Sequence, residues 1–352
     1  MPQQTPNSWR RLTLFGAIFI ALTAAGLYSV YQQFAGRELT FDTRLIQPVP
    51  VLAAMMLLAT YYVSDALRLG YTLKALGHHM PLPRLLKLVF INLFFSNITP
   101  MATGGGFAQI WYLQRSGVPI GHATAATTIR TLLAVAFIFS LTPVCLLALN
   151  IFDKESIGAD VGTALVVFVF IYLGFFSLVL FRTRWLIGPI SATLTRLHRW
   201  RWISDHRHQR WQYKARREML RFARAFGEYW AGDRWAVTLS IFFTAVFLLT
   251  LFSFPSLLIW ALGYSADYLT ALGLLNITTF IMYFSPTPGA SGISEGVFGH
   301  FFRALIGGQH LILVIITWRL LTIYVGMVIG LWLFKRTLAN ELVSPRKNPL
   351  TP

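Results

Sequence analysis

Two arginines inside apolar sequence are the first candidates for chemistry. Arg130 and Arg319 each lie within a run long enough to cross a membrane. An arginine at the centre of such a helix costs about 2.5–3.5 kcal/mol on insertion scales, so each needs a partner or a task. A guanidinium matches the geometry of a phosphate at two places at once, which predicts recognition of an anion. The alternative is structural: pairing with a carboxylate or with helix carbonyls, or snorkelling to an interface.

A glutamate in an unusual stretch is the third candidate. Glu295 is the one acid in SPTPGASGISEG, residues 285–296, which interrupts apolar sequence. It follows Ser291 by four residues, so one hypothesis is that it caps the start of a helix. A second hypothesis pairs it with Arg319 or Arg130. A third makes it a carboxylate that takes up protons during transport. The spacing leaves all three open.

Arg68 is a weaker candidate for binding a substrate. It lies in SDALRLG, near the end of an apolar run. Pairing with Asp65, three residues earlier, explains it about as well as ligand binding does. So does placement at a membrane interface, where a long side chain reaches polar surroundings.

Proline and glycine break two further apolar stretches, at residues 84–116 and 267–306. Each half is too short to cross a bilayer comfortably. A helix, a break and a half-helix predict a re-entrant hairpin, whose irregular backbone must be buried in protein or line a watery cavity. Glycines there permit tight turns and close backbone approach, and polar side chains can satisfy freed backbone groups. The predicted break residues are Asn97, Thr99, Pro100, Gly104, Gly105, Pro286, Pro288, Gly289 and Gly292.

The composition sets the class of protein around these residues. The 352 residues are 55% hydrophobic and 12% charged, against about 25% charged in a typical soluble domain. This predicts an all-α polytopic membrane protein with about six full transmembrane helices plus the two hairpins. The predicted spans are 12–34, 48–69, 119–150, 160–181, 235–262 and 310–334.

The distribution of charge predicts the orientation. Residues 182–234 hold 13 Lys/Arg against four acids, which is typical of a cytoplasmic loop. The same rule places both termini in the cytoplasm and the acidic loop near 153–160 outside. We expect the protein to lie in the cytoplasmic membrane. The linker 182–233 has apolar residues at helical spacing, including Phe226 and Tyr229, between basic faces. We expect it to lie on anionic inner-leaflet lipids or to serve as a plain connector.

The two hairpins and the arginine spans predict an internal repeat. Ser96 and Ser285 lie 189 positions apart, as do Arg130 and Arg319. The first hairpin follows a span that ends inside and the second follows one that ends outside, so the repeats are expected to be inverted, as in secondary transporters. The predicted organisation is an N-terminal helix and external loop (1–45), a first membrane repeat (46–181), the basic linker (182–233), a second membrane repeat (234–336) and a cytoplasmic tail (337–352).

Other classes of function have little support in the sequence. The net charge of +17 fits cytoplasmic loops better than nucleic-acid binding. No metalloprotease, Walker or nucleophile-elbow motif is present, and the histidines lack metal-ligand spacing, so we expect no metal and no cofactor. The leading hypothesis is a lipid transporter that is not an enzyme. The rivals are a membrane enzyme acting on a lipid-linked substrate and a non-transporting scaffold of an envelope-lipid pathway. Headgroup, direction of transport, energy source and oligomeric state cannot be read from the sequence.

Three motifs carry a resemblance to a known family. SNITPMATGGG, SPTPGASGISEG and WRLLTIYVGMVIGL resemble the flippase-like transmembrane region of lysylphosphatidylglycerol synthases over roughly residues 45–336. The resemblance implies a translocase of anionic or modified lipids, in a stand-alone form without the synthase domain, and related members accompany hopanoid and glycolipid pathways. It departs from the family pattern at Ala290, where a second glycine is common, and at Ile129, where an acid is common. The motif positions it carries over are Arg130, Pro288, Gly289, Glu295, Arg319 and Tyr324.

Overall fold

The structure is a computed structural model that describes residues 42–149 and 224–343, together with a few isolated positions. Every regular element within these ranges is helical. The spans predicted at 12–34 and 160–181, and most of the linker 182–233, lie outside the described residues.

Four long apolar helices match four of the predicted spans. They are α2 (Pro48–Ala75), α5 (Ile120–Ala148), α9 (Arg234–Ala261) and a continuous helix that contains residues 310–337. Each candidate span of 27 or 28 residues would extend for about 40 Å, more than the roughly 30 Å of a hydrocarbon core. The protein is therefore an all-α polytopic membrane protein, as the composition predicts.

The continuous helix has an irregular turn after Arg319. It begins as α12 (Gly308–Arg319), passes through the π-helical turn η5 (Leu320–Tyr324) and continues as α13 (Val325–Val343). π-Helical turns are rare in proteins, and those that occur are often found at functional sites. This turn contains Tyr324 and directly follows the arginine that the sequence singles out.

Two shorter helix pairs are broken where the sequence predicts. The first broken segment runs through α3 (Leu82–Ile98), the short turn η2 (Pro100–Ala102) and α4 (Thr103–Arg115). The second runs through α10 (Tyr268–Met282), η4 (Pro288–Ala290) and α11 (Ile293–Phe302). None of these helices reaches the roughly 20 residues that a straight span needs.

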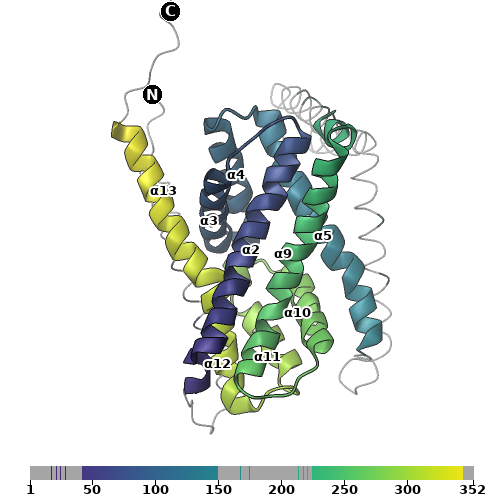
Figure 1. The fold of residues 1–352 in the computed structure, drawn as a ribbon, viewed down its shortest axis with the longest axis vertical. Helices are drawn as coiled ribbons and strands as arrows, with labels where there is room; N and C mark the ends of the chain where they lie inside the picture. Colours follow the sequence, from purple (N-terminus) through teal and green to yellow (C-terminus); the bar gives the residue numbers. More distant parts are fainter. Residues whose placement is uncertain are drawn as a thin grey trace, which may run out of the picture. The chain divides into compact units, whose positions relative to one another are not determined.

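The chain divides into two compact units that do not follow chain order. Unit 1 contains residues 1–66, 82–109 and 250–352, and unit 2 contains residues 67–81 and 110–249. Within unit 1, α13 packs along α3, and α11 contacts both α10 and α12 (Figure 1). The turns η2 and η4 also contact each other, so the two breaks meet in one unit.

Two glycines set the close contact of α13 with α3. A Cβ on Gly330 would lie 2.0 Å from the carbonyl oxygen of Phe90, and one on Gly326 would lie 2.8 Å from Leu93 Cδ1. Gly326 and Gly330 are four residues apart and so share a helix face, which is the small-xxx-small pattern of membrane helix pairs. This contact was not among the predictions made from the sequence.

In unit 2, the helical segment 224–231 packs its apolar side against protein. Phe226 and Tyr229 are buried, and the Tyr229 hydroxyl lies 2.6 Å from Ser240 Oγ. A Cβ on Gly232 would lie 2.2 Å from the carbonyl oxygen of Ala75, so the chain passes very close to the end of α2. The described end of the linker is thus fixed to α2 and α9.

Candidate functional site

The two breaks have the same backbone conformation over four residues, 99–102 and 287–290, and differ after them, where Thr103 is helical and Ser291 is extended. Each has an extended threonine, a proline and two residues with positive φ. In the first break, φ is 52° at Met101 and 53° at Ala102, and in the second it is 57° at Gly289 and 53° at Ala290. Such angles cost non-glycine residues about 1–3 kcal/mol and persist only where the surroundings enforce them. The shared conformation supports an internal repeat, while its inversion stays a prediction.

Threonine and serine hydroxyls satisfy backbone groups that the breaks leave free. In the first break, Thr99 Oγ1 accepts from the Gly104 N–H at 2.8 Å and donates to the carbonyl of Phe95. In the second, Thr287 Oγ1 donates to the carbonyl of Ser291 at 2.9 Å, and Ser285 Oγ accepts from the Thr287 N–H at 3.3 Å. The sequence predicts that polar side chains satisfy the freed backbone groups, and these hydroxyls do so.

A buried ion pair joins the second break to α12. Arg319 Nε donates to Glu295 Oε1 at 2.7 Å, and Arg319 Nη2 lies 2.6 Å from the same oxygen. Arg319 Nη1 donates to the carbonyl of Gly289 at 3.1 Å. The side chains are 1% and 0% exposed, respectively. Of the two arginines that the sequence offers as partners, the structure pairs Glu295 with Arg319.

Glu295 is also a helix cap. Its Oε2 accepts from the Gly292 N–H at 2.7 Å and from the Ser294 hydroxyl at 2.8 Å. The capping hypothesis is therefore confirmed together with the pairing hypothesis, because each carboxylate oxygen serves one of them. The helix begins after Gly292, whose φ of 83° requires a glycine, and not after Ser291.

An aromatic cluster begins beside Arg319, whose guanidinium carbon lies 5.8 Å from the centre of the Trp318 ring. Trp318 stacks on Phe298 with ring centroids 4.8 Å apart, and Phe298 stacks on Phe302 at 4.0 Å. The indole Nε1 of Trp318 is buried and has no hydrogen-bond partner in the described part of the chain. The ion pair thus lies in apolar surroundings, where water cannot screen it and its attraction is strong.

The geometry around Arg319 bears on the prediction that this arginine binds a headgroup phosphate. Each of its three nitrogens faces a protein oxygen, from Glu295 or from Gly289. The guanidinium is 1% exposed, so a phosphate could reach it only if the side chains packed around it moved. In the conformation described, the pair therefore holds the break closed, and binding of a headgroup stays a prediction.

The other predicted binding residues lie in different parts of the fold. Arg130 and Arg68 are buried in unit 2, and the Arg68 guanidinium carbon lies 3.8 Å from the centre of the Phe247 ring. The predicted pairing of Arg68 with Asp65 stays a prediction. Tyr324 closes the π-helical turn and is half-buried.

The predicted break residues differ in what surrounds them: Asn97 bonds within its own helix, two glycines contact α3 closely, and the prolines differ in burial. Asn97 donates from Nδ2 to the Leu93 carbonyl within α3, and so does not serve the freed groups of the break. Gly104 and Gly105 meet α3 closely, since a Cβ on Gly105 would overlap Ser96 Oγ at 1.8 Å. Pro286 is exposed, whereas Pro288 is buried.

A second polar cluster, in unit 1, was missed by the sequence analysis. His310 Nε2 lies 3.3 Å from Asp42 Oδ2, and His310 Nδ1 lies 2.8 Å from the Tyr264 hydroxyl. Asp42 also accepts from Arg44 Nε and from the Arg44 backbone N–H, at 2.9 Å each. These hydrogen bonds lower the pKa of Asp42 to about 2. The residues come from three distant segments, so no local spacing announces them.

A third cluster lies in unit 2. His78 Nε2 lies 2.7 Å from His122 Nδ1, and His122 Nε2 lies 3.0 Å from Glu228 Oε2. Burial lowers the pKa of His78, and the neighbouring charges of His122 and His79 lower it further. In the described residues, no group of three or more potential ligands is arranged to hold a metal ion.

Two comparisons with known proteins can be set beside this geometry. A family model described as the lysylphosphatidylglycerol synthase TM region matches residues 13–330. A UPF0104 membrane protein of Archaeoglobus fulgidus is 21% identical over 310 residues, which cover 88% of this chain and 93% of that protein. The family match extends over far more than half of the chain and includes both breaks, Glu295 and Arg319. The chain therefore belongs to the family of the lysylphosphatidylglycerol synthase transmembrane region.

Proposed function

We propose that this multi-pass membrane protein is a lipid transporter of the flippase type, which moves an anionic or modified phospholipid across the cytoplasmic membrane. The observation that carries the proposal is the Glu295–Arg319 pair. It is buried inside an apolar span and contacts the irregular backbone of a broken helix. Ionisable groups at such places are costly and typically mark a transport pathway.

The paired breaks support the same function. Broken helices near the middle of the membrane are typical of secondary transporters, where half-helix termini and freed backbone groups form the substrate site. Here η2 and η4 contact each other, and α3 also contacts η4. We propose that these segments are re-entrant hairpins in an inverted repeat, with the N- and C-termini in the cytoplasm.

The pair suggests a mechanism of exchange. The carboxylate of Glu295 occupies the position on Arg319 that a headgroup phosphate would take. Displacing it frees the guanidinium and removes the side-chain oxygen that caps the Gly292 N–H, which loosens the start of α11. A proton on Glu295 would weaken the same contact. Headgroup binding and opening of the second break would then be coupled through one carboxylate.

The basic linker supports a lipid substrate less directly. We propose that its cations gather anionic lipids of the inner leaflet, each contributing about 1 kcal/mol near the surface. The described end, 224–231, packs Phe226 and Tyr229 against protein, while its one basic residue, Arg224, is exposed.

Reconstitution tests the function. Purified protein in liposomes would be given fluorescent phosphatidylglycerol, its aminoacylated form or phosphatidylcholine, and an impermeant quencher would report movement between leaflets. We expect movement of the anionic or modified lipid, with its mass unchanged and at a lower rate in Arg319→Lys. A change in lipid mass would favour the membrane-enzyme rival. Neither movement nor a mass change for any lipid would favour the scaffold.

A further inference from the structure

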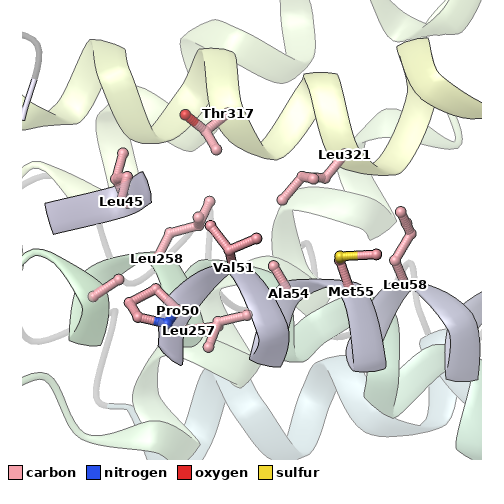
Figure 2. A pocket seen from close by; sticks show the side chains of 11 residues that line it. Leu45, Pro50, Val51, Ala54, Met55, Leu58, Leu257, Leu258, Thr317 and Leu321 are labelled. Atoms are coloured by element: carbon pink, nitrogen blue, oxygen red, sulfur yellow. The ribbon is translucent and has the colours of Figure 1, made fainter. Parts of the chain in front are cut away.

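Unit 1 has an apolar slot that the ion pair does not use. Its volume is about 150 Å³, and its walls come from η1 (Thr43–Ile46), the first half of α2, the end of α9 and the stretch of helix around Arg319. Figure 2 shows Leu45 and Pro50 at one end and Leu58 and Leu321 at the other. The one polar side chain in the lining is Thr317, whose hydroxyl donates to the Leu313 carbonyl.

The slot lies on the opposite side of the helix from the ion pair. Thr317 and Leu321 are four residues apart and share a face, whereas Arg319 lies about half a turn around from each of them. Arg319 is committed to Glu295 and Gly289 on its own side. A ligand in the slot would therefore be bound by the same helix without touching the pair.

The size, shape and opening of the slot fit a hydrocarbon chain. A space of this volume can hold a ligand of about six carbons. The slot follows α2 from Pro50 to Leu58, about 12 Å along a membrane-crossing helix, which is the direction in which lipid chains lie. Val51 and Met55 line it and are 39% and 64% exposed, so the slot is open beside this part of α2.

A cationic group lies at the Leu45 end. Arg44 precedes Leu45 and binds Asp42 through Nε and Nη2, which fixes the plane of its guanidinium. Its side chain is 44% exposed, and Nη1 lies 2.8 Å from where a Cβ on Gly263 would be. His310 faces the same carboxylate, so one acid is shared between two basic side chains. Asp42 uses the Nε–Nη2 edge of this guanidinium, so a phosphate group would bind at the other edge, formed by Nη1 and the second proton of Nη2.

We infer that this slot binds one acyl chain of a membrane phospholipid whose headgroup phosphate lies beside Arg44. The inference goes beyond the proposed function, because the lipid held here need not be the one that is moved. Binding in the slot can therefore be measured without any transport, and a failure of one proposal leaves the other standing.

The first test uses a phosphatidylglycerol with a photoreactive group in its acyl chain, added to the full-length protein in nanodiscs. We expect the label on peptides that line the slot, around Met55 and Leu321. Ala54→Phe fills the slot and should abolish this labelling, whereas Ala59→Phe makes the same change at an exposed position of α2 outside the slot and should preserve it. Labelling spread evenly over exposed apolar residues such as Val328 and Trp332 would overturn the inference.

The second test concerns the phosphate. Diacylglycerol with the same photoreactive chain lacks this group, so wild type should label less with it than with phosphatidylglycerol. Arg44→Gln should remove that preference, and Arg303→Gln, at an exposed arginine outside the cluster, should keep it. Equal labelling by both lipids in wild type would contradict a phosphate site. A benzophenone side chain placed at Met55 that captures residues 12–34 of the same chain, and no lipid, would overturn the inference as well.

Discussion

Arg319 and Glu295, 24 residues apart in the chain, share two nitrogen–oxygen contacts of 2.7 and 2.6 Å while both side chains are fully buried. The remaining carboxylate oxygen of Glu295 caps α11, and the remaining guanidinium nitrogen binds Gly289 in the break. One pair therefore connects the membrane span, the break and the half-helix that follows it. A change in this pair should affect all three together.

The first prediction is that Glu295→Gln destabilises the protein. A glutamine oxygen can still cap Gly292, but Arg319 would lose its anion in a buried place. Breaking such a pair costs about 3–5 kcal/mol. Thermal unfolding in detergent should show a clearly lower Tm than that of wild type.

Two controls separate the loss of the pair from a general effect of the substitution. Glu228→Gln changes a glutamate that is 47% exposed, and exposed pairs contribute about 0–1 kcal/mol, so its Tm should stay near that of wild type. Combining Glu295→Gln with Arg319→Met should restore part of the stability, since no unpaired charge is left buried. If the double variant is as unstable as Glu295→Gln, the unpaired charge is not the cause.

The second prediction concerns the guanidinium of Arg319. Arg319→Lys keeps the charge, but an ammonium cannot contact Glu295 with two nitrogens and Gly289 with a third. We expect Arg319→Lys to slow lipid movement clearly while lowering the Tm only a little. Arg130→Lys should also slow lipid movement if Arg130 binds the headgroup. Full transport activity in both variants would reduce these arginines to simple charges or to structure.

The sequence predicts the parts of this site that depend on local chemistry. Apolar length locates the four described spans, and Pro100 and Pro288 locate the breaks, because proline and glycine act within a few residues. The cap formed by Glu295 has a local signal as well. No local signal shows that Glu295 pairs with Arg319 and not with Arg130, because this pairing depends on how α11 packs on α12.

The same limit explains what the sequence analysis missed. His310 meets Asp42 and Tyr264, and His78 meets His122, across long stretches of chain. Histidines at such distances have no spacing to recognise. The Gly326–Gly330 pair is different, since its small-xxx-small pattern is visible in the sequence and could have predicted a helix contact.

A third prediction tests that contact. Gly330→Ala would place a methyl group 2.0 Å from the Phe90 carbonyl oxygen, and a backbone atom cannot turn aside. We expect α13 to shift from α3 at a cost of about 1–3 kcal/mol, seen as a lower Tm. Gly121→Ala is the matched control, because a Cβ there meets nothing within 4 Å and alanine favours helix. A similar fall in Tm for both variants would argue against close packing at Gly330.

The fourth prediction concerns acid pH. Burial, followed by the charges of His122 and His79, lowers the pKa of His78 below the usual histidine value of 6.5, so the folded state favours the neutral form. Just below pH 6.5, His78 therefore binds a proton more readily in the unfolded chain than in the folded chain, and its contribution to stability falls as the pH falls through this range. Glu228 also faces His122 and limits the repulsion between the two rings.

Tm measured from pH 7.5 to pH 5.5 checks this sign. Wild type should lose more Tm on acidification than His78→Gln, which has no proton to take up at this position. His300→Gln removes an exposed histidine elsewhere and should keep the slope of wild type. An identical slope in His78→Gln and wild type would show that this cluster does not carry the pH dependence.

The last prediction tests the inverted arrangement of the two broken segments. Positive charge in the sequence places the first segment's ends in the cytoplasm and the second segment's ends outside. Ser116 follows α4 and Ser265 precedes α10, so the two serines should lie on opposite sides of the membrane. Each would be changed to cysteine; Cys145 is buried in α5 and should react little. In intact cells, an impermeant maleimide should label Ser265→Cys, and it should label Ser116→Cys only after the membrane is opened. Labelling of both from outside would mean that the segments enter from one side, and the repeats could then not be inverted.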